Sequence, residues 1–208
     1  MTIPMALVDY IPVLFFALSA SLMLRDLYHA MSKGAFALLA AGTIMITTAG
    51  FFKATWKLLY AANICDFEAL NRCFFPMQST GFLLAGVALV CLLCLRQHPK
   101  MLSVAAPAVF SGTMIFVMMM VLGAMGLCVS LAIIALRMKK KGAAVLFMLS
   151  FVFMLTMGYL SSKDFAEPMM NWMAEGVNVI GQGMLLAGTN ILHKAGLGKV
   201  TDIRTMAA

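Results

Sequence analysis

Residues 101–136 read MLSVAAPAVFSGTMIFVMMMVLGAMGLCVSLAIIAL, and no charged residue stands between Lys100 and Arg137. A single α-helix over these 36 residues would be about 54 Å long, whereas the hydrocarbon core of a bilayer is about 30 Å thick. The stretch therefore predicts two successive membrane helices. We expect a tight turn between them near Gly123-Ala-Met-Gly126.

The composition of the whole chain agrees with a membrane protein. Of its 208 residues, 63% are hydrophobic and 11% are charged. A soluble domain is about 45–50% apolar and about 25% charged, so an ordinary soluble domain is excluded. The formal net charge of +7 comes from basic residues in short loops and gives no contiguous basic surface, so nucleic-acid binding is not expected.

Apolar runs between charges predict about seven transmembrane helices in a single polytopic membrane domain that covers residues 1–208. Three helices are expected at about 8–30, 34–60 and 74–95. A linker helix follows at about 101–120, and a fifth helix begins at about 121. The last two are expected at about 142–161 and 170–192, followed by a short basic cytoplasmic tail at 194–208.

The basic residues also predict the orientation. With seven helices and the amino terminus outside, 11 of the 15 basic residues face the cytoplasm; six helices with the amino terminus inside give 10 against 5. We therefore expect a multi-pass protein of the plasma membrane, or of the bacterial inner membrane, with a cytoplasmic carboxyl terminus.

Two passages of the sequence resemble each other. Ser79–Gly86 (STGFLLAG) and Gly181–Gly188 (GQGMLLAG) agree at five of eight positions. They suggest two parallel three-helix repeats, at about 8–95 and 121–193, joined by the linker helix. In transporters built from repeats, the substrate site lies at the repeat interface.

This three-plus-one-plus-three plan resembles the topology of the SWEET and PQ-loop sugar transporters. The Pro-Gln dipeptide of those proteins is absent here, and the nearest string is Pro76-Met-Gln78. The resemblance implies a helical arrangement alone, and it assigns a role to no residue.

Polar side chains recur on one face of the last predicted helix. At 100° per residue, Asn171, Glu175, Asn178 and Gln182 lie within about 60° of one another. Such side chains usually face a cavity or a partner because hydrocarbon does not solvate them. The same reasoning gives a candidate substrate-binding set for a small polar or anionic solute: Lys53, Lys57, Gln78, Glu175, Asn178 and Gln182.

Within this set we expect an ion pair between Lys53 and Glu175, which the spacing places at similar depth. Two alternatives stay open. The amides can instead hold helices together, and Lys57 can extend outward to the membrane surface.

No nucleotide-binding, protease or hydrolase motif is present, and the histidines show no metal-binding spacing. The sequence therefore gives no reason to expect an enzyme, a cofactor or a metal. We expect a small-solute membrane transporter with an outward-opening polar cavity between the helix repeats. The alternatives are an accessory or sensory subunit bound to a membrane-protein partner, and a membrane enzyme acting on a lipid or quinone.

Overall fold

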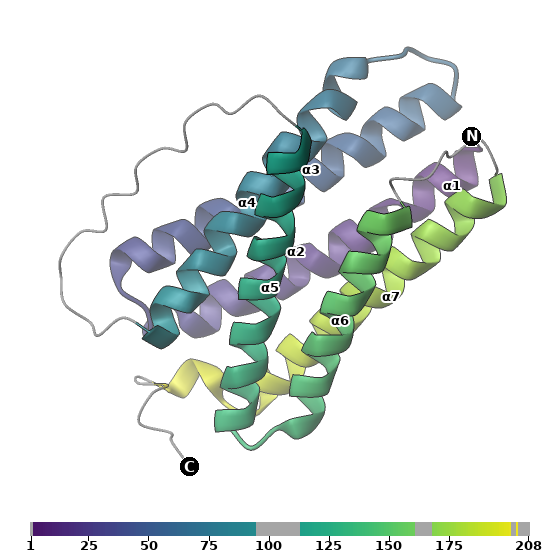
Figure 1. Ribbon diagram of the computed structural model, residues 1–208. Helices are drawn as coiled ribbons and strands as arrows, with labels where there is room; N and C mark the ends of the chain where they lie inside the picture. Colours follow the sequence, from purple (N-terminus) through teal and green to yellow (C-terminus); the bar gives the residue numbers. More distant parts are fainter. Residues whose placement is uncertain (1, 95–112, 161–167, 201–202, 204–208) are drawn as a thin grey trace.

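The computed structural model describes residues 2–94, 113–160, 168–200 and 203, and the described part is helical and contains no strand. A short helix α1 (Ile3–Val8) leads into α2 (Tyr10–Leu27), which is followed by α3 (Lys33–Ala61) and α4 (Glu68–Cys94). The later helices are α5 (Thr113–Arg137), α6 (Lys141–Leu160) and α7 (Pro168–Lys194), with the single turn η1 (Leu197–Lys199) after them. Figure 1 shows the long helices as one elongated bundle.

Five helices of the described chain are long and apolar enough to cross a membrane: Ile3–Leu27, Lys33–Ala61, Glu68–Cys94, Met114–Arg137 and Lys141–Gly158. Many of their large apolar side chains point away from the bundle, as lipid contact requires. These exposed side chains include Leu14, Leu18, Ile44, Val87, Val90, Met118, Leu122, Val145, Leu149 and Val152. The prediction of a helical, multi-pass membrane protein is therefore supported, while the number of seven crossings is not decided by this part of the chain.

The predicted turn at Gly123–Gly126 is wrong, because α5 continues through it without interruption. The 25 residues of α5 span about 37 Å, enough to cross a bilayer once. Of the predicted linker helix at 101–120, residues 101–112 lie outside the described part, and 113–120 belong to α5. The glycines that suggested a turn serve helix packing instead. A Cβ atom on Gly123 would lie 2.3 Å from the carbonyl carbon of Phe82 in α4.

The six long helices form a closed ring in chain order. Each packs on the next from α2 to α7, and α7 packs back on α2. Neighbours are antiparallel within the two triplets α2–α3–α4 and α5–α6–α7. For example, Lys53 lies over Phe74 while Gly42 meets Gly81, so α3 and α4 run in opposite directions.

The two places where the triplets meet are parallel instead. Along α4 and α5, Phe75 contacts Phe116, and Gly86 approaches Gly123 further along both helices. Along α2 and α7, Phe15 lies near Gly183, and Asp26 binds His193. We call these contacts the α4–α5 seam and the α2–α7 seam. Because α4 and α5 are parallel, α4 ends at the opposite end of the ring from the start of α5 (Figure 1).

The two ends of the ring differ in packing. We call the end where α3 stops and α4 starts the upper end, and the end where α2 stops and α3 starts the lower end. Towards the lower end the interior is filled by side chains that are almost wholly buried: Leu27, Leu39, Leu89, Leu131, Ile134, Phe147, Leu192, Leu197 and Ile203. The upper half encloses the space described next.

Candidate functional site

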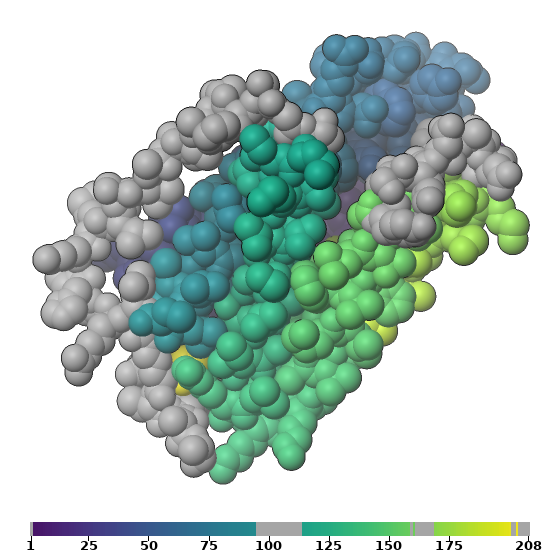
Figure 2. All heavy atoms as spheres, viewed as in Figure 1, coloured from purple at the N-terminus to yellow at the C-terminus, as the bar shows by residue number. Residues whose placement is uncertain are grey.

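The upper half of the ring encloses a cavity of about 800 Å³, to which α2 to α7 all contribute. Ligand pockets are about 300–1,000 Å³, so this volume suits a small molecule. The rings of Phe16 and Phe82, 6.2 Å apart, lie on its lower side. In Figure 2 the surface is hollowed between the beginning of α5 and the end of α6, and residues of α2 are visible behind.

All six residues of the predicted substrate-binding set line this one cavity. Lys53 and Lys57 come from α3, Gln78 comes from α4, and the other three come from α7. Residues more than a hundred positions apart in the chain are thus brought together, although their role as a binding site stays a prediction.

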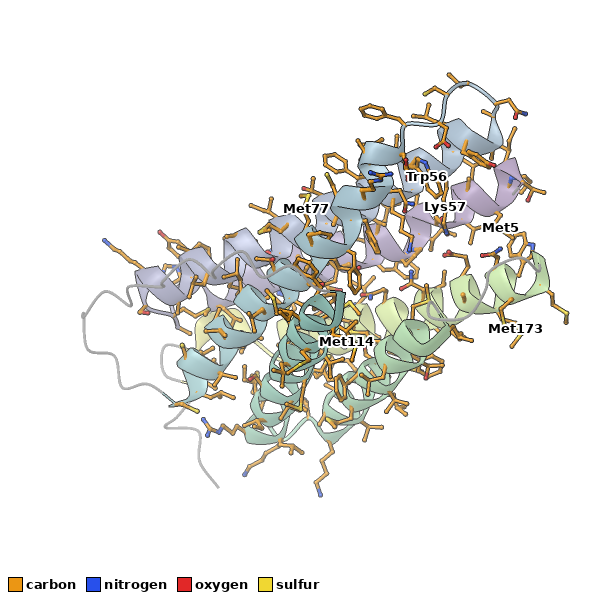
Figure 3. The ribbon with its side chains drawn as sticks, turned by 45° about the horizontal axis from the view of Figure 1, so that its top comes forward. Met5, Trp56, Lys57, Met77, Met114 and Met173 are labelled. Carbon is orange, nitrogen blue, oxygen red and sulfur yellow. The ribbon has the colours of Figure 1, made fainter. Side chains whose placement is uncertain are left out.

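Lys57 lies at the centre of a buried cluster of charges. Its Nζ atom donates a hydrogen bond to Oε1 of Glu175 over 2.8 Å and forms a second ion pair with Asp9. Lys57, Asp9 and Glu175 are only 8%, 6% and 4% exposed. The three side chains stand on α3, at the junction of α1 and α2, and on α7, so the cluster joins the two triplets across the α2–α7 seam. In Figure 3, Lys57 lies between the end of α3 and the beginning of α7.

The predicted pair of Lys53 with Glu175 is therefore wrong, because Glu175 binds Lys57. The two lysines lie on one face of α3, but Lys57 is one turn nearer the upper end, where α7 begins. Its burial also contradicts the alternative in which Lys57 extends outward.

Lys53 is held differently from Lys57. Its Nζ atom lies 4.1 Å from the ring centroid of Phe74, the geometry of a cation–π contact. Among the described residues, no carboxylate lies within salt-bridge distance of Lys53, since the recorded ion pairs all involve other side chains. The positive charge of Lys53 therefore faces the cavity, and no carboxylate of the described chain forms a salt bridge with it.

Two acceptor atoms on α7 complete the polar wall. Oε1 of Gln182 and Oε2 of Glu175 are buried and have no hydrogen-bond partner among the described residues. Buried polar atoms are normally hydrogen-bonded, because an unsatisfied acceptor costs roughly 1–3 kcal/mol. These atoms belong to residues that line the cavity, and they can accept hydrogen bonds from a bound molecule.

Sequence reasoning missed Asp9 as a member of the site. The available signal was its position just inside an apolar run, where an ionisable side chain usually has a partner. Its partner Lys57 is 48 residues away in the chain, and sequence periodicity within one helix does not reveal such a pairing.

A second pair, also missed and only partly buried, closes the lower end of the α2–α7 seam. Asp26, 4% exposed, accepts a hydrogen bond from Nδ1 of His193 over 2.9 Å. Arg25 lies against the other ring nitrogen of His193 at 3.4 Å. After α7 the chain turns back so that Leu197 and Ile203 are buried in the same region. The cavity is thus separated from the lower end by packed side chains and by this pair.

In the described part of the chain, no three histidine, cysteine or acidic side chains are grouped as metal ligands. Cys65 and Cys73, near the upper end, are both exposed free thiols. The charged, amide and apolar side chains that line the cavity offer ionic contact, hydrogen bonding and apolar contact.

Comparison with known proteins finds no relative from which to transfer a role. No protein-family model, curated protein or solved structure matches this chain.

Proposed function

We propose that this chain is a small-solute membrane transporter whose substrate binds in the upper cavity. The observation that carries the proposal is the cavity itself. The ring of apolar helices surrounds a space of about 800 Å³, and buried ionisable and amide side chains of these helices line it. Ionisable residues within transmembrane helices usually mark a solute or ion pathway. Helix–helix adhesion alone would not require the unpaired acceptors or the cavity.

The helix directions support two three-helix units in the same orientation. The triplets α2–α3–α4 and α5–α6–α7 follow the same sequence of directions, and both seams between them are parallel. A rotation of one triplet onto the other would exchange the two seams, as expected for parallel repeats with a site between them. The proposal keeps the predicted seven crossings; the linker helix expected at 101–120 would make the additional one, and its residues 101–112 lie outside the described part of the chain.

The helix directions fit this arrangement of repeats, but the sequence match between the repeats does not fit it as well. Gly86 approaches Gly123 across the α4–α5 seam, whereas its counterpart Gly188 packs on Phe147 of α6, within its own triplet. The matched glycines thus face different neighbours. The proposed repeat therefore rests on the helix directions.

In this proposal α7 also crosses the membrane. Its 27 residues are long enough, and its polarity lies on the cavity side. The upper end then faces outside, since most basic residues of the described loops and helix ends, with the exception of Arg72, gather at the lower end: Arg25, Lys33, Arg137, Lys139, Lys140, Lys141, Lys194 and Lys199. A positive bias of this kind marks the cytoplasmic side.

The α2–α7 seam provides a route for alternating access. Its upper end is held by the Lys57 cluster and its lower end by Asp26 and His193. Rocking of one triplet against the other would open one end while the other stays closed. In the described conformation both ends of this seam are held, and packed side chains close the lower end.

The test is a screen for bound solutes by thermal stabilisation of the purified full-length protein, followed by uptake of any hit into proteoliposomes. A ligand of the native state raises the melting temperature by mass action. We expect a solute class that stabilises the wild type and loses its effect in Glu175→Gln, while the exposed control Glu68→Gln behaves like the wild type. Stabilising solutes that the protein does not transport would contradict the proposal, as would a complete lack of them. In that case co-purification would test the alternative of an accessory subunit with a protein partner.

A further inference from the structure

We propose, on the basis of the transport function above, that the substrate is a zwitterionic small molecule with an apolar body, of the amino-acid class. Its anionic group would bind Lys53, and its ammonium group would bind the acceptors of Glu175 and Gln182. The apolar body would lie between α4 and α5. The charges, the unpaired acceptors and the apolar lining of the cavity each support one part of this assignment.

The charges of the cavity suit a ligand without net charge. Two lysines, Lys53 and Lys57, stand with two carboxylates, Asp9 and Glu175, so the formal sum is zero when all four are ionised. A net anion or cation would add an uncompensated charge to a site of low polarity, where desolvation is costly. A zwitterion adds none.

The charges are also separated in space, which defines where each end of the ligand binds. Asp9 and Glu175 flank Lys57, so that group carries an excess of one negative charge when all three are ionised. The compensating cation is Lys53, one helical turn or about 6 Å deeper along α3. Within the described residues, Lys53 makes a cation–π contact with Phe74 and forms no hydrogen bond or salt bridge. This leaves its ammonium group able to donate hydrogen bonds to a carboxylate.

Two acceptors on α7 line the same cavity. Oε2 of Glu175 and Oε1 of Gln182 are buried, line the cavity and have no partner within the described residues. A carboxylate oxygen and an amide oxygen accept hydrogen bonds only, so both atoms require a donor. An ammonium group supplies up to three donors and a positive charge, whereas a second carboxylate would be repelled.

Apart from the amides of Asn71, Gln78 and Asn178 and the hydroxyl of Thr47, the rest of the lining is apolar and adaptable. This apolar part of the lining includes Phe75 of α4, Met114 and Met120 of α5, and Met154 of α6. Methionine side chains are flexible and fit irregular shapes. An apolar side chain of variable shape, rather than a sugar with hydroxyl groups around its ring, suits such a wall.

The experiment compares three ligands that differ only in their charged groups: L-phenylalanine, phenethylamine without the carboxylate, and 3-phenylpropionate without the ammonium group. The purified full-length protein is titrated with each and its melting temperature is followed. We expect the zwitterion to bind at least about tenfold more tightly than either analogue, because each loses a charge-assisted hydrogen bond.

Variants assign each end of the ligand. Lys53→Gln should remove the preference for L-phenylalanine over phenethylamine, and Lys53→Arg, which keeps the charge, should retain it. Glu175→Gln should remove the preference over 3-phenylpropionate. The controls Arg72→Gln and Glu68→Gln remove the same charges at exposed positions at the start of α4 and should change neither preference.

The outcomes separate this inference from the transport proposal. If either analogue binds as well as L-phenylalanine, or if only a different solute class stabilises and is transported, the zwitterion assignment is overturned while the transport proposal stands. If zwitterions bind but do not cross proteoliposome membranes, the transport proposal fails and the binding assignment stands.

Discussion

Replacing Lys57 by methionine should destabilise the protein more than replacing either of its two carboxylate partners. Lys57→Met leaves Asp9 and Glu175 buried beside each other without their cation. Breaking a buried ion pair in this way costs about 3–5 kcal/mol. Glu175→Gln leaves Lys57 paired with Asp9 and removes one charged contact, for which about 1–3 kcal/mol is expected. The difference follows from the central place of Lys57 in the cluster.

The measurement is the free energy of unfolding in detergent micelles for each variant. The control is Lys33→Met, an exposed lysine on the same helix, which should stay within about 0.5 kcal/mol of the wild type. In the Asp9→Asn, Glu175→Gln background, Lys57→Met should cost much less than in the wild type, because no buried carboxylate then remains unpaired. A cost of Lys57→Met equal to that of Lys33→Met, or no change in that cost with background, would refute the reasoning.

Three further predictions concern packing and orientation. Gly123→Ala should destabilise the protein by about 1–3 kcal/mol, because its Cβ would overlap α4, whereas Gly176→Ala, with open space around it, should be neutral or stabilise by about 0.5–1 kcal/mol. Thermal unfolding compares the two variants. Equal effects would contradict the close approach of α4 and α5. Ser150→Ala should cost about 0.5–1.5 kcal/mol by removing the hydrogen bond to the carbonyl oxygen of Gly181, and an unchanged unfolding free energy would show that this bond contributes nothing. A variant whose sole cysteine is Cys65 should react with a membrane-impermeant maleimide on intact cells; labelling only after lysis would reverse the proposed orientation.

The sequence allowed the helical membrane class and the polar faces to be predicted, because both depend on local information. Composition decides between lipid and water as the surrounding medium. A period of 3.6 residues places Glu175, Asn178 and Gln182 on one face whatever surrounds the helix. The structure accordingly brings these residues to one cavity.

Pairings between helices could not be predicted in the same way, because they depend on the relative shift and tilt of helices. A displacement of one turn decides whether Glu175 meets Lys53 or Lys57. The error at Gly123–Gly126 has a similar origin. A glycine in an apolar run can permit either a turn or the close approach of another helix, and only the neighbouring α4 shows which one applies.

The helix that contributes most to the candidate site is also the one that hydropathy describes least well. The described spans that are apolar enough to cross a membrane do not include α7, although it is as long as α4. Mean hydropathy averages over all faces of a helix. A helix with one face on a cavity and one on lipid therefore has a mean hydropathy between that of a wholly apolar transmembrane helix and that of a soluble helix. The polar residues that lower the score of α7 are Asn171, Glu175, Asn178 and Gln182, and three of them are members of the predicted set that line the cavity. In a chain that otherwise consists of strongly apolar helices, the least apolar long helix is therefore the first place to look for a binding site. Periodicity then identifies its functional face, while its partners on other helices have to come from the fold.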